Sequence, residues 1–149
     1  MKIFLDTSLL SDAGLAEFGE QIALQVEEGS NFFVSSVTHF QLLWGYALAG
    51  MTPTGYEGFL EQTGTEVVPL TKLDAKEAAG LKPGASELLD ALIAASVNRH
   101  DAELWTLDRD FLKLLPKARV HIFRSRNEAP TGAAQAKGRK KVAGSDDEK

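Results

Sequence analysis

Cysteine is absent from this 149-residue sequence. Its absence excludes disulfides, thiolate zinc sites and thiol nucleophiles, so any metal ion must be bound by oxygen atoms or by the three histidines. Long hydrophobic runs are also missing, since none approaches the roughly 18 apolar residues of a membrane span. The segment from Met1 to Leu10 lacks the basic region of a signal peptide. We therefore expect a cytoplasmic protein with no membrane segment.

Positive charge is scarce over much of the chain. Residues 1–108 contain only five Lys or Arg side chains, whereas residues 109–126 contain six against the single acid Asp110. The six cations are Arg109, Lys113, Lys117, Arg119, Arg124 and Arg126. Two interpretations remain open: a basic rim that holds phosphates beside an acidic pocket, or a solvated helix face next to an edge strand guarded by cations.

The composition indicates one globular domain. A hydrophobic share of 44% and a charged share of 25% match soluble globular proteins and exclude a fibrous or wholly disordered chain. We expect a single domain over residues 1–126. Residues 127–149 are rich in Ala, Gly and Lys and cannot bury enough apolar surface to fold, so we expect a disordered tail there.

Short β-favouring segments alternate with segments of helical periodicity. We expect strands at residues 2–5, 32–34, 66–68, 104–107 and 120–123. We expect helices at 16–26, from Ser35 or Ser36 to Leu48, and at 55–62, 73–81, 87–99 and 109–115, with Ser86 capping the helix at 87–99. This alternation predicts a three-layer α/β/α fold with a central parallel sheet of four to five strands.

Aspartates follow two of the expected strands directly. Asp6 comes after residues 2–5 and Asp108 after residues 104–107. Because ligand sites of open α/β sheets form beyond the carboxyl ends of the strands, we expect both carboxylates at one edge of the sheet. Each residue taken alone is also a plausible helix N-cap.

Asp90 lies on the apolar face of the expected helix at 87–99, with Ile93 and Val97. A lone buried carboxylate costs several kcal/mol or takes up a proton. No Lys or Arg stands three or four residues away, and Glu87 adds repulsion one turn earlier. A divalent cation is the simplest compensation, and a capping or surface acid is the alternative.

Gathering Asp6, Asp90 and Asp108 around Mg²⁺ or Mn²⁺ gives an arrangement suited to phosphodiester hydrolysis. Asp110 is a candidate outer ligand or water-orienting group, or alternatively a first-turn acid favoured by the helix dipole. Thr106 and Ser36 are candidates for hydrogen bonds to these acids. A phosphoaspartyl phosphatase is disfavoured, because Ser8 occupies the position where that class needs a second Asp.

Four strings in the sequence resemble the successive motifs of a known family. KIFLDTSLL, VSSVTHFQLLWG, LLDALIAASV and LWTLDRDF are similar to the motifs of PIN-domain nucleases, most closely the VapC-like toxins of prokaryotic toxin-antitoxin pairs. The resemblance covers residues 2–123. It implies Mg²⁺- or Mn²⁺-dependent endonucleolytic cleavage of structured RNA, a homodimer and a cognate antitoxin. It places the metal ligands on Asp6, Asp90 and Asp108, with Thr106 as the hydroxyl residue of the last motif.

One position departs from the family pattern. Gln41 stands where the second motif carries a glutamate, and no acid lies within one helical turn of it. An amide still offers a carbonyl oxygen to a metal ion but lacks the charge of a carboxylate. Two interpretations follow: a nuclease that works with three aspartates and Asp110, or a catalytically weakened or inactive PIN-like domain that binds RNA or a protein partner.

The segment from Phe40 to Leu48 carries more large hydrophobic side chains than one buried helix face requires. Either this helix is buried all round, or it presents an interface to a second copy of the chain or to an antitoxin.

Overall fold

The computed structural model describes residues 1–125; the tail expected at 127–149 lies outside the described residues. The strands are β1 (Lys2–Leu5), β2 (Asn31–Ser35), β3 (Glu66–Val68), β4 (Glu103–Thr106) and β5 (Val120–Ile122). The α-helices are α1 (Thr7–Leu10), α2 (Asp12–Glu27), α3 (Ser36–Leu48), α4 (Thr54–Thr63), α5 (Lys72–Gly80) and α6 (Leu88–Arg99). Three 3₁₀ turns accompany them: η1 (Ala85–Glu87), η2 (Arg109–Lys113) and η3 (Lys117–Arg119).

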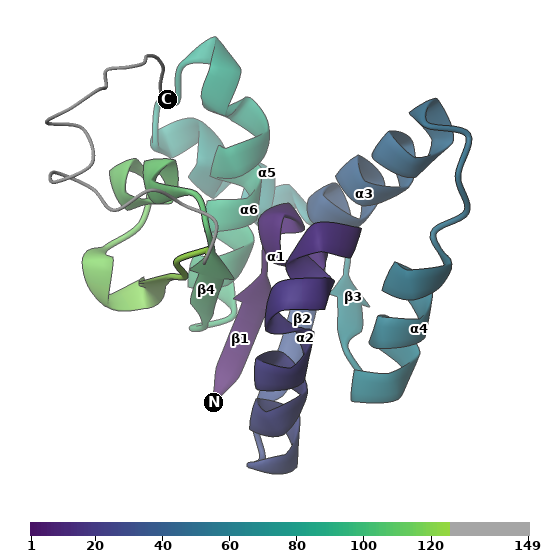
Figure 1. The fold of residues 1–149 in the computed structure, drawn as a ribbon. Helices are drawn as coiled ribbons and strands as arrows, with labels where there is room; N and C mark the ends of the chain where they lie inside the picture. The colour runs from purple at the N-terminus through teal and green to yellow at the C-terminus, as the bar shows by residue number, and fades with distance from the viewer. Residues whose placement is uncertain (126–149) are drawn as a thin grey trace, which may run out of the picture.

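All five strands form one parallel sheet in the order β3-β2-β1-β4-β5 (Figure 1). The central strand β1 pairs with β2 on one side and with β4 on the other, where Leu5 lies opposite Trp105. The order therefore reverses direction between β1 and β4. Such a switch point opens a crevice at the carboxyl ends of the two strands.

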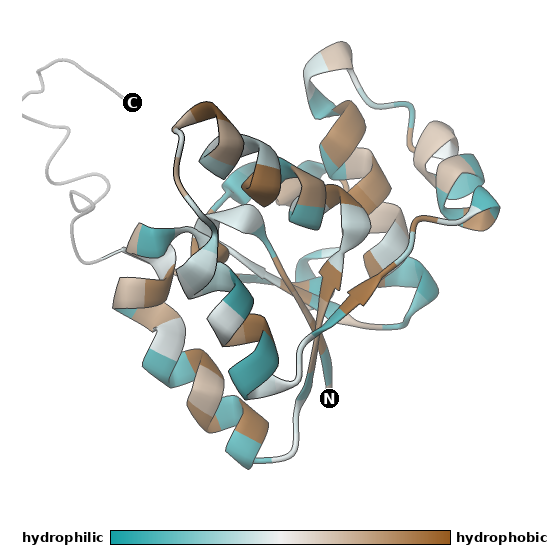
Figure 2. Cartoon of the chain, turned by 90° about the vertical axis from the view of Figure 1, so that its right-hand side faces the viewer, coloured by the Kyte–Doolittle hydropathy of each residue, from teal (hydrophilic) through white to brown (hydrophobic). Residues whose placement is uncertain are grey.

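The sheet is buried on both faces because side chains of each strand alternate between two hydrophobic clusters. In β1, Ile3 and Leu5 belong to a cluster with residues of α1, α2 and α4. Phe4 between them joins a second cluster with residues of α6 and η2. Figure 2 shows the hydrophobic strands in the middle of the fold with helices on either side. The predicted three-layer α/β/α fold is confirmed.

Helix α1 was not predicted, because four residues are too few to show helical periodicity. Leu9 and Leu10 on this helix are fully buried in the core. Its neighbour α2 approaches so closely that a Cβ atom on Gly14 would lie 2.4 Å from the carbonyl oxygen of Ser8. Close packing that only glycine permits therefore fixes the turn that follows Asp6.

Serine hydroxyls begin two of the helices. Ser11 Oγ accepts a hydrogen bond from the Gly14 amide at 3.1 Å, so α2 begins four residues before the predicted 16–26. Ser35 Oγ accepts from the Val37 amide at 3.1 Å and caps α3, as one of the two predicted caps.

The prediction that Ser86 caps α6 was wrong. Ser86 lies inside η1, and Glu87 occupies the N-cap position without a side-chain cap. The Glu87 carboxylate instead accepts a hydrogen bond from the Gly84 amide at 3.2 Å and closes this turn. The helix predicted at 109–115 is also shorter than expected, because η2 ends at Lys113 and Pro116 follows.

A buried ion pair joins α5 to α6. The Asp74 carboxylate, which has no exposed surface, accepts hydrogen bonds from Arg99 Nε at 2.6 Å and from Ser96 Oγ at 3.2 Å. It also accepts from the Thr71 amide at 3.0 Å within a capping box. Burial alone would raise the pKa of Asp74, but the hydrogen bonds from Arg99 and Thr71 hold it below its ordinary value. The pair fixes the position of α6, which carries Asp90.

Within residues 1–125, the helices are all too short or too polar to cross a lipid bilayer.

We expect Asp74→Asn to lower the free energy of unfolding by about 2–4 kcal/mol, because it leaves the Arg99 guanidinium without its charged partner. Urea denaturation at neutral pH measures the loss. The matched control is Asp101→Asn, which breaks an exposed pair with Arg119 and should cost less than about 1 kcal/mol. Equal losses in both variants would contradict the structural role of Asp74.

Candidate active site

The candidate site lies at the carboxyl edge of the sheet, at the switch point between β1 and β4. Asp6 directly follows β1, and its amide donates a hydrogen bond to the Trp105 carbonyl at 3.1 Å. Asp108 comes two residues after the end of β4. Since β1 and β4 are parallel neighbours, both aspartates emerge at the same edge, as the sequence predicted.

Three hydroxyl groups hold the Asp6 carboxylate, which is 4% exposed. Thr106 Oγ1 donates to Oδ2 at 2.7 Å and Ser8 Oγ donates to the same oxygen at 3.0 Å. Thr7 Oγ1 donates to Oδ1 at 3.4 Å. Burial raises the pKa of Asp6 above its ordinary value, and these hydrogen bonds offset only part of the rise. The carboxylate is therefore fixed in orientation but short of compensating charge.

Ser8 is a site residue that the sequence reasoning missed. Besides donating to Asp6, its hydroxyl oxygen accepts a hydrogen bond from the Leu107 amide at 3.0 Å and lies 3.4 Å from Thr106 Oγ1. It thus ties the first turn after β1 to the loop after β4. The available signal was its position two residues after Asp6, in the turn that α1 forms.

Thr106 connects two of the aspartates. Its hydroxyl group donates to Asp6 and accepts a hydrogen bond from the Asp108 amide at 2.9 Å. The predicted hydrogen bond from Thr106 to an acid of the site is therefore present. Asp108 Oδ1 in turn accepts from the Asp110 amide at 2.9 Å and caps η2. Capping occupies only one of the two oxygens of Asp108, so capping and ligand roles are compatible.

Asp90 stands in the first turn of α6 and is half-buried rather than fully buried. Burial, followed by the negative charges of Asp6, Asp108, Asp110 and Glu87, raises the pKa of Asp90 to about 6. Among the described residues, no side chain donates a hydrogen bond to Asp90 or forms an ion pair with it. The fold thus concentrates like charge around a carboxylate that has no cationic partner there.

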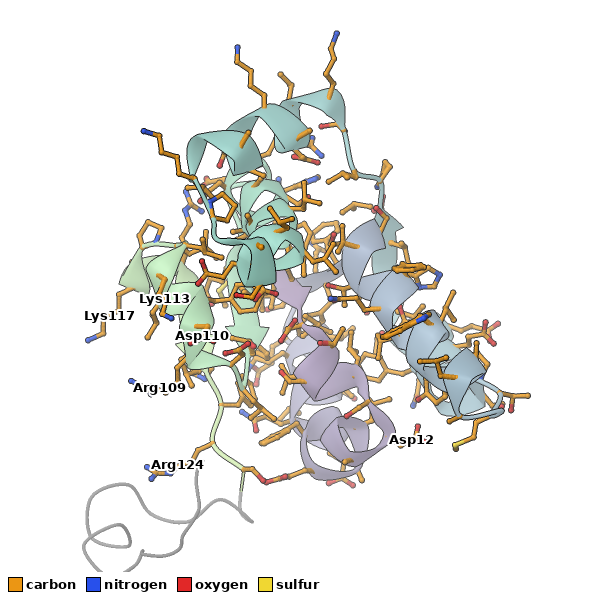
Figure 3. The ribbon with its side chains drawn as sticks, turned by 90° about the horizontal axis from the view of Figure 1, so that it is seen from above. Asp12, Arg109, Asp110, Lys113, Lys117 and Arg124 are labelled. Carbon is orange, nitrogen blue, oxygen red and sulfur yellow. The ribbon has the colours of Figure 1, made fainter. Side chains whose placement is uncertain are left out.

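The remaining supporting candidates lie further from this cluster. Asp110 is exposed and forms an ion pair with Lys113 at 3.6 Å, and Figure 3 shows it among basic side chains at the rim of the edge. The Ser36 hydroxyl accepts a hydrogen bond from the Leu70 amide at 3.1 Å. The expected bond between Ser36 and an acid of the site is not found within residues 1–125.

Gln41 is half-buried and lines an apolar groove of about 590 Å³ beside the cluster, together with Thr7 of α1 and Leu89 of α6. The same groove contains a carboxylate that is remote in sequence, Asp12. Its Oδ1 accepts a hydrogen bond from the Tyr46 hydroxyl at 2.6 Å. Asp12 is already engaged by this contact. It is therefore a poor replacement for a glutamate at position 41.

The donor set of the cluster fits a hard divalent cation, since carboxylate oxygens are the ligands that Mg²⁺ and Mn²⁺ prefer. The negative charges near Asp90 also favour a bound cation at this edge. Within residues 1–125, however, no three acidic or histidine side chains converge into a complete ligand set. Holding an ion would therefore require these side chains to lie closer together than they do here.

Comparison with known proteins gives a consistent family and fold. The profile of the PIN domain matches residues 3–114. One similar structure is VapBC2 from Rickettsia felis bound to a DNA fragment from the VapBC2 promoter. A chain of it superimposes with a TM-score of 0.68 at 16% identity, covering 83% of this chain and 100% of that chain.

Two further structures are similar. DNA-bound VapBC from Salmonella typhimurium gives a TM-score of 0.59 at 20% identity, over 82% of this chain and 98% of that chain. A toxin-antitoxin complex from Klebsiella pneumoniae gives a TM-score of 0.57 at 18% identity, over 80% of this chain and 95% of that chain. At these identities the likeness shows the fold alone. Comparison with curated protein sequences gives no significant match.

We expect Asp90→Asn to raise the melting temperature at pH 8 when no divalent cation is present. The pKa of Asp90 in the folded protein lies above that in the unfolded chain, so its ionised form destabilises the fold above pH 6. One unit of pKa shift corresponds to about 1.4 kcal/mol, and partial exposure reduces the total gain to about 1–2 kcal/mol. The gain should shrink as the pH falls through 6, where wild-type Asp90 becomes protonated.

Mn²⁺ should then stabilise the wild-type protein more than Asp90→Asn in the same thermal measurement. Glu61→Gln, an equal charge change at an exposed position of α4, serves as the control and should respond to Mn²⁺ as the wild type does. Equal stabilisation of wild type and Asp90→Asn by Mn²⁺ would contradict the assignment of Asp90 as a ligand.

Proposed function

The chain belongs to the PIN domain family, and from this premise we propose that it is a Mg²⁺- or Mn²⁺-dependent endoribonuclease, the toxin of a toxin-antitoxin pair, that cleaves structured RNA. The observation that carries the proposal is the state of Asp90, whose pKa is raised to about 6 beside Asp6 and Asp108 without a cationic partner among the described residues. A binding surface for RNA alone gives no reason to concentrate like charge at this edge. A divalent ion in a nuclease site gives such a reason, because several carboxylates are needed to bind it.

The ion would be held by Asp6, Asp90 and Asp108. When bound, it supplies activation of a water molecule and stabilisation of charge on the phosphate oxygens. Thr106 and Ser8 are positioning residues: their hydroxyl groups restrain the Asp6 carboxylate through hydrogen bonds of 2.7 and 3.0 Å. Burial of Asp6 excludes bulk water from this side of the site and strengthens the interactions of its charge.

A second candidate function follows from Gln41. With an amide at this position and Asp12 engaged by Tyr46, the groove side of the cluster carries less negative charge than a site with a glutamate at position 41. The alternative is a weakened or inactive PIN-like domain that binds RNA or a protein partner without cleavage. The two functions differ in whether pure protein cleaves RNA.

The RNA experiment uses purified protein, total cellular RNA and Mn²⁺. We expect wild-type protein to cleave, and Asp6→Asn or Asp90→Asn to abolish cleavage because each removes a ligand charge. Thr106→Val should reduce the rate about 10–100-fold by releasing Asp6, and Thr106→Ser should restore most of it. Gln41→Glu should raise the rate.

The control is Glu61→Gln, which should cleave at the wild-type rate. Cleavage that persists unchanged in both Asp6→Asn and Asp90→Asn would refute the nuclease function. Cleavage by Gln41→Glu but not by the wild type would instead favour the inactive domain.

The apolar face of α3 supports a protein partner. Phe40, Trp44 and Leu48 recur every four residues and are 60%, 55% and 69% exposed. Exposure of three large side chains in one stripe shows that this helix is not buried all round in the isolated chain. We propose that the stripe and the adjoining groove contact a second copy of the chain or an antitoxin; one structure of similar fold is a toxin-antitoxin complex.

Sedimentation velocity at micromolar concentration tests the homodimer. We expect the wild-type chain to sediment as a dimer and Leu48→Glu to shift it toward monomer, since a charge in an apolar interface is costly. Leu73→Glu on α5, an equally exposed leucine away from the stripe, is the control and should remain dimeric. A strictly monomeric wild type would contradict the homodimer.

A further inference from the structure

Cations are distributed unevenly over the fold. Residues 3–71, which form most of β1, helices α1 to α4 and strands β2 and β3, contain no Lys or Arg. The same segment contains nine acids: Asp6, Asp12, Glu17, Glu20, Glu27, Glu28, Glu57, Glu61 and Glu66. This segment therefore offers no permanently charged cation to a phosphate, since its only basic side chain is His39, whose Nδ1 lies 2.7 Å from the Tyr56 hydroxyl. Its net charge repels a polyanion.

Basic side chains gather on the opposite side of the acidic cluster. Arg109 and Lys113 lie on η2, and Lys117 begins η3. Figure 3, which looks down on the carboxyl edge of the sheet, shows these three side chains together with Arg124 on one side, while Asp12 lies on the other side near α3. We call Arg109, Lys113 and Lys117 the basic edge; all three are exposed.

Arg119 is different from these residues although it is close in sequence. Its guanidinium donates to the Ala102 carbonyl at 2.9 Å and to Asp101 at 2.8 Å. These contacts hold η3 against the start of β4, so Arg119 has a structural role. Arg126 lies outside the described residues.

The basic edge begins where the acidic cluster ends. Asp108 caps η2, so Arg109 is the residue immediately after a candidate metal ligand. Lys113 is 66% exposed, and its ammonium lies 3.6 Å from Asp110 and 3.9 Å from Glu87. Exposed pairs at such distances contribute about 1 kcal/mol or less, so a phosphate can replace them at little cost.

We propose that RNA reaches the acidic cluster from one side only, with its phosphates on the basic edge and none on the surface of α1 to α4. The inference rests on the proposed function, which identifies the polyanion as RNA. It adds the direction from which the RNA approaches: the RNA strand crosses η3 and η2 and then reaches Asp108.

The test measures RNA binding apart from cleavage, by fluorescence anisotropy of a labelled RNA hairpin in EDTA over a series of NaCl concentrations. Lys113→Gln/Lys117→Gln removes two charges from the basic edge. Lys72→Gln/Lys76→Gln removes two from α5, which packs on α6. We expect the first pair to weaken binding about tenfold and to lower the slope of log affinity against log salt by about 1–1.5, since each phosphate contact contributes about 0.7.

The control pair should leave that slope unchanged. Equal effects of the two pairs would show that only net charge matters, and no effect of the first pair would remove the basic edge from RNA binding; either result overturns the proposal. Thermal melts of both pairs exclude unfolding as the cause. Because no cleavage is measured, a protein that binds as described but never cuts would refute the nuclease function and leave this inference intact.

Discussion

The negative charge gathered around Asp90 at the carboxyl edge of the sheet is the interaction on which the proposed function depends. The four ion pairs found within residues 1–125 include none of Asp6, Asp90 or Asp108. Other parts of the fold place these acids at the same edge of the sheet: β1 and β4 pair side by side, and hydroxyl groups fix Asp6. The buried pair between α5 and α6 holds the helix that carries Asp90.

The sequence predicted what depends on regular patterns. Alternating strands and helices predicted the parallel sheet, and the rule for strand ends placed Asp6 and Asp108 at one edge. These two predictions succeeded because backbone periodicity and strand direction determine them. The prediction that Asp90 is buried on the apolar face of its helix was met only in part, since Asp90 is half-buried.

Features that depend on tertiary contact could not be predicted. Helix α1 exists because Gly14 lets α2 approach the Ser8 carbonyl, and the network of Ser8 joins segments almost a hundred residues apart. Asp12 enters the groove beside Gln41 from a different helix, so a search within one helical turn missed it.

The proposed partners occupy different parts of the surface, with the apolar stripe of α3 for protein and the basic edge for RNA.

The central claim is that a divalent ion resolves the repulsion at this edge. Anomalous diffraction from crystals grown with Mn²⁺ tests it most directly, because the signal locates the metal without reference to activity. The account predicts an anomalous peak between the carboxylates of Asp6, Asp90 and Asp108 in the wild type, and a weaker or absent peak in Asp90→Asn. A fully ordered edge with no manganese peak, or a peak bound elsewhere on the chain, would contradict it.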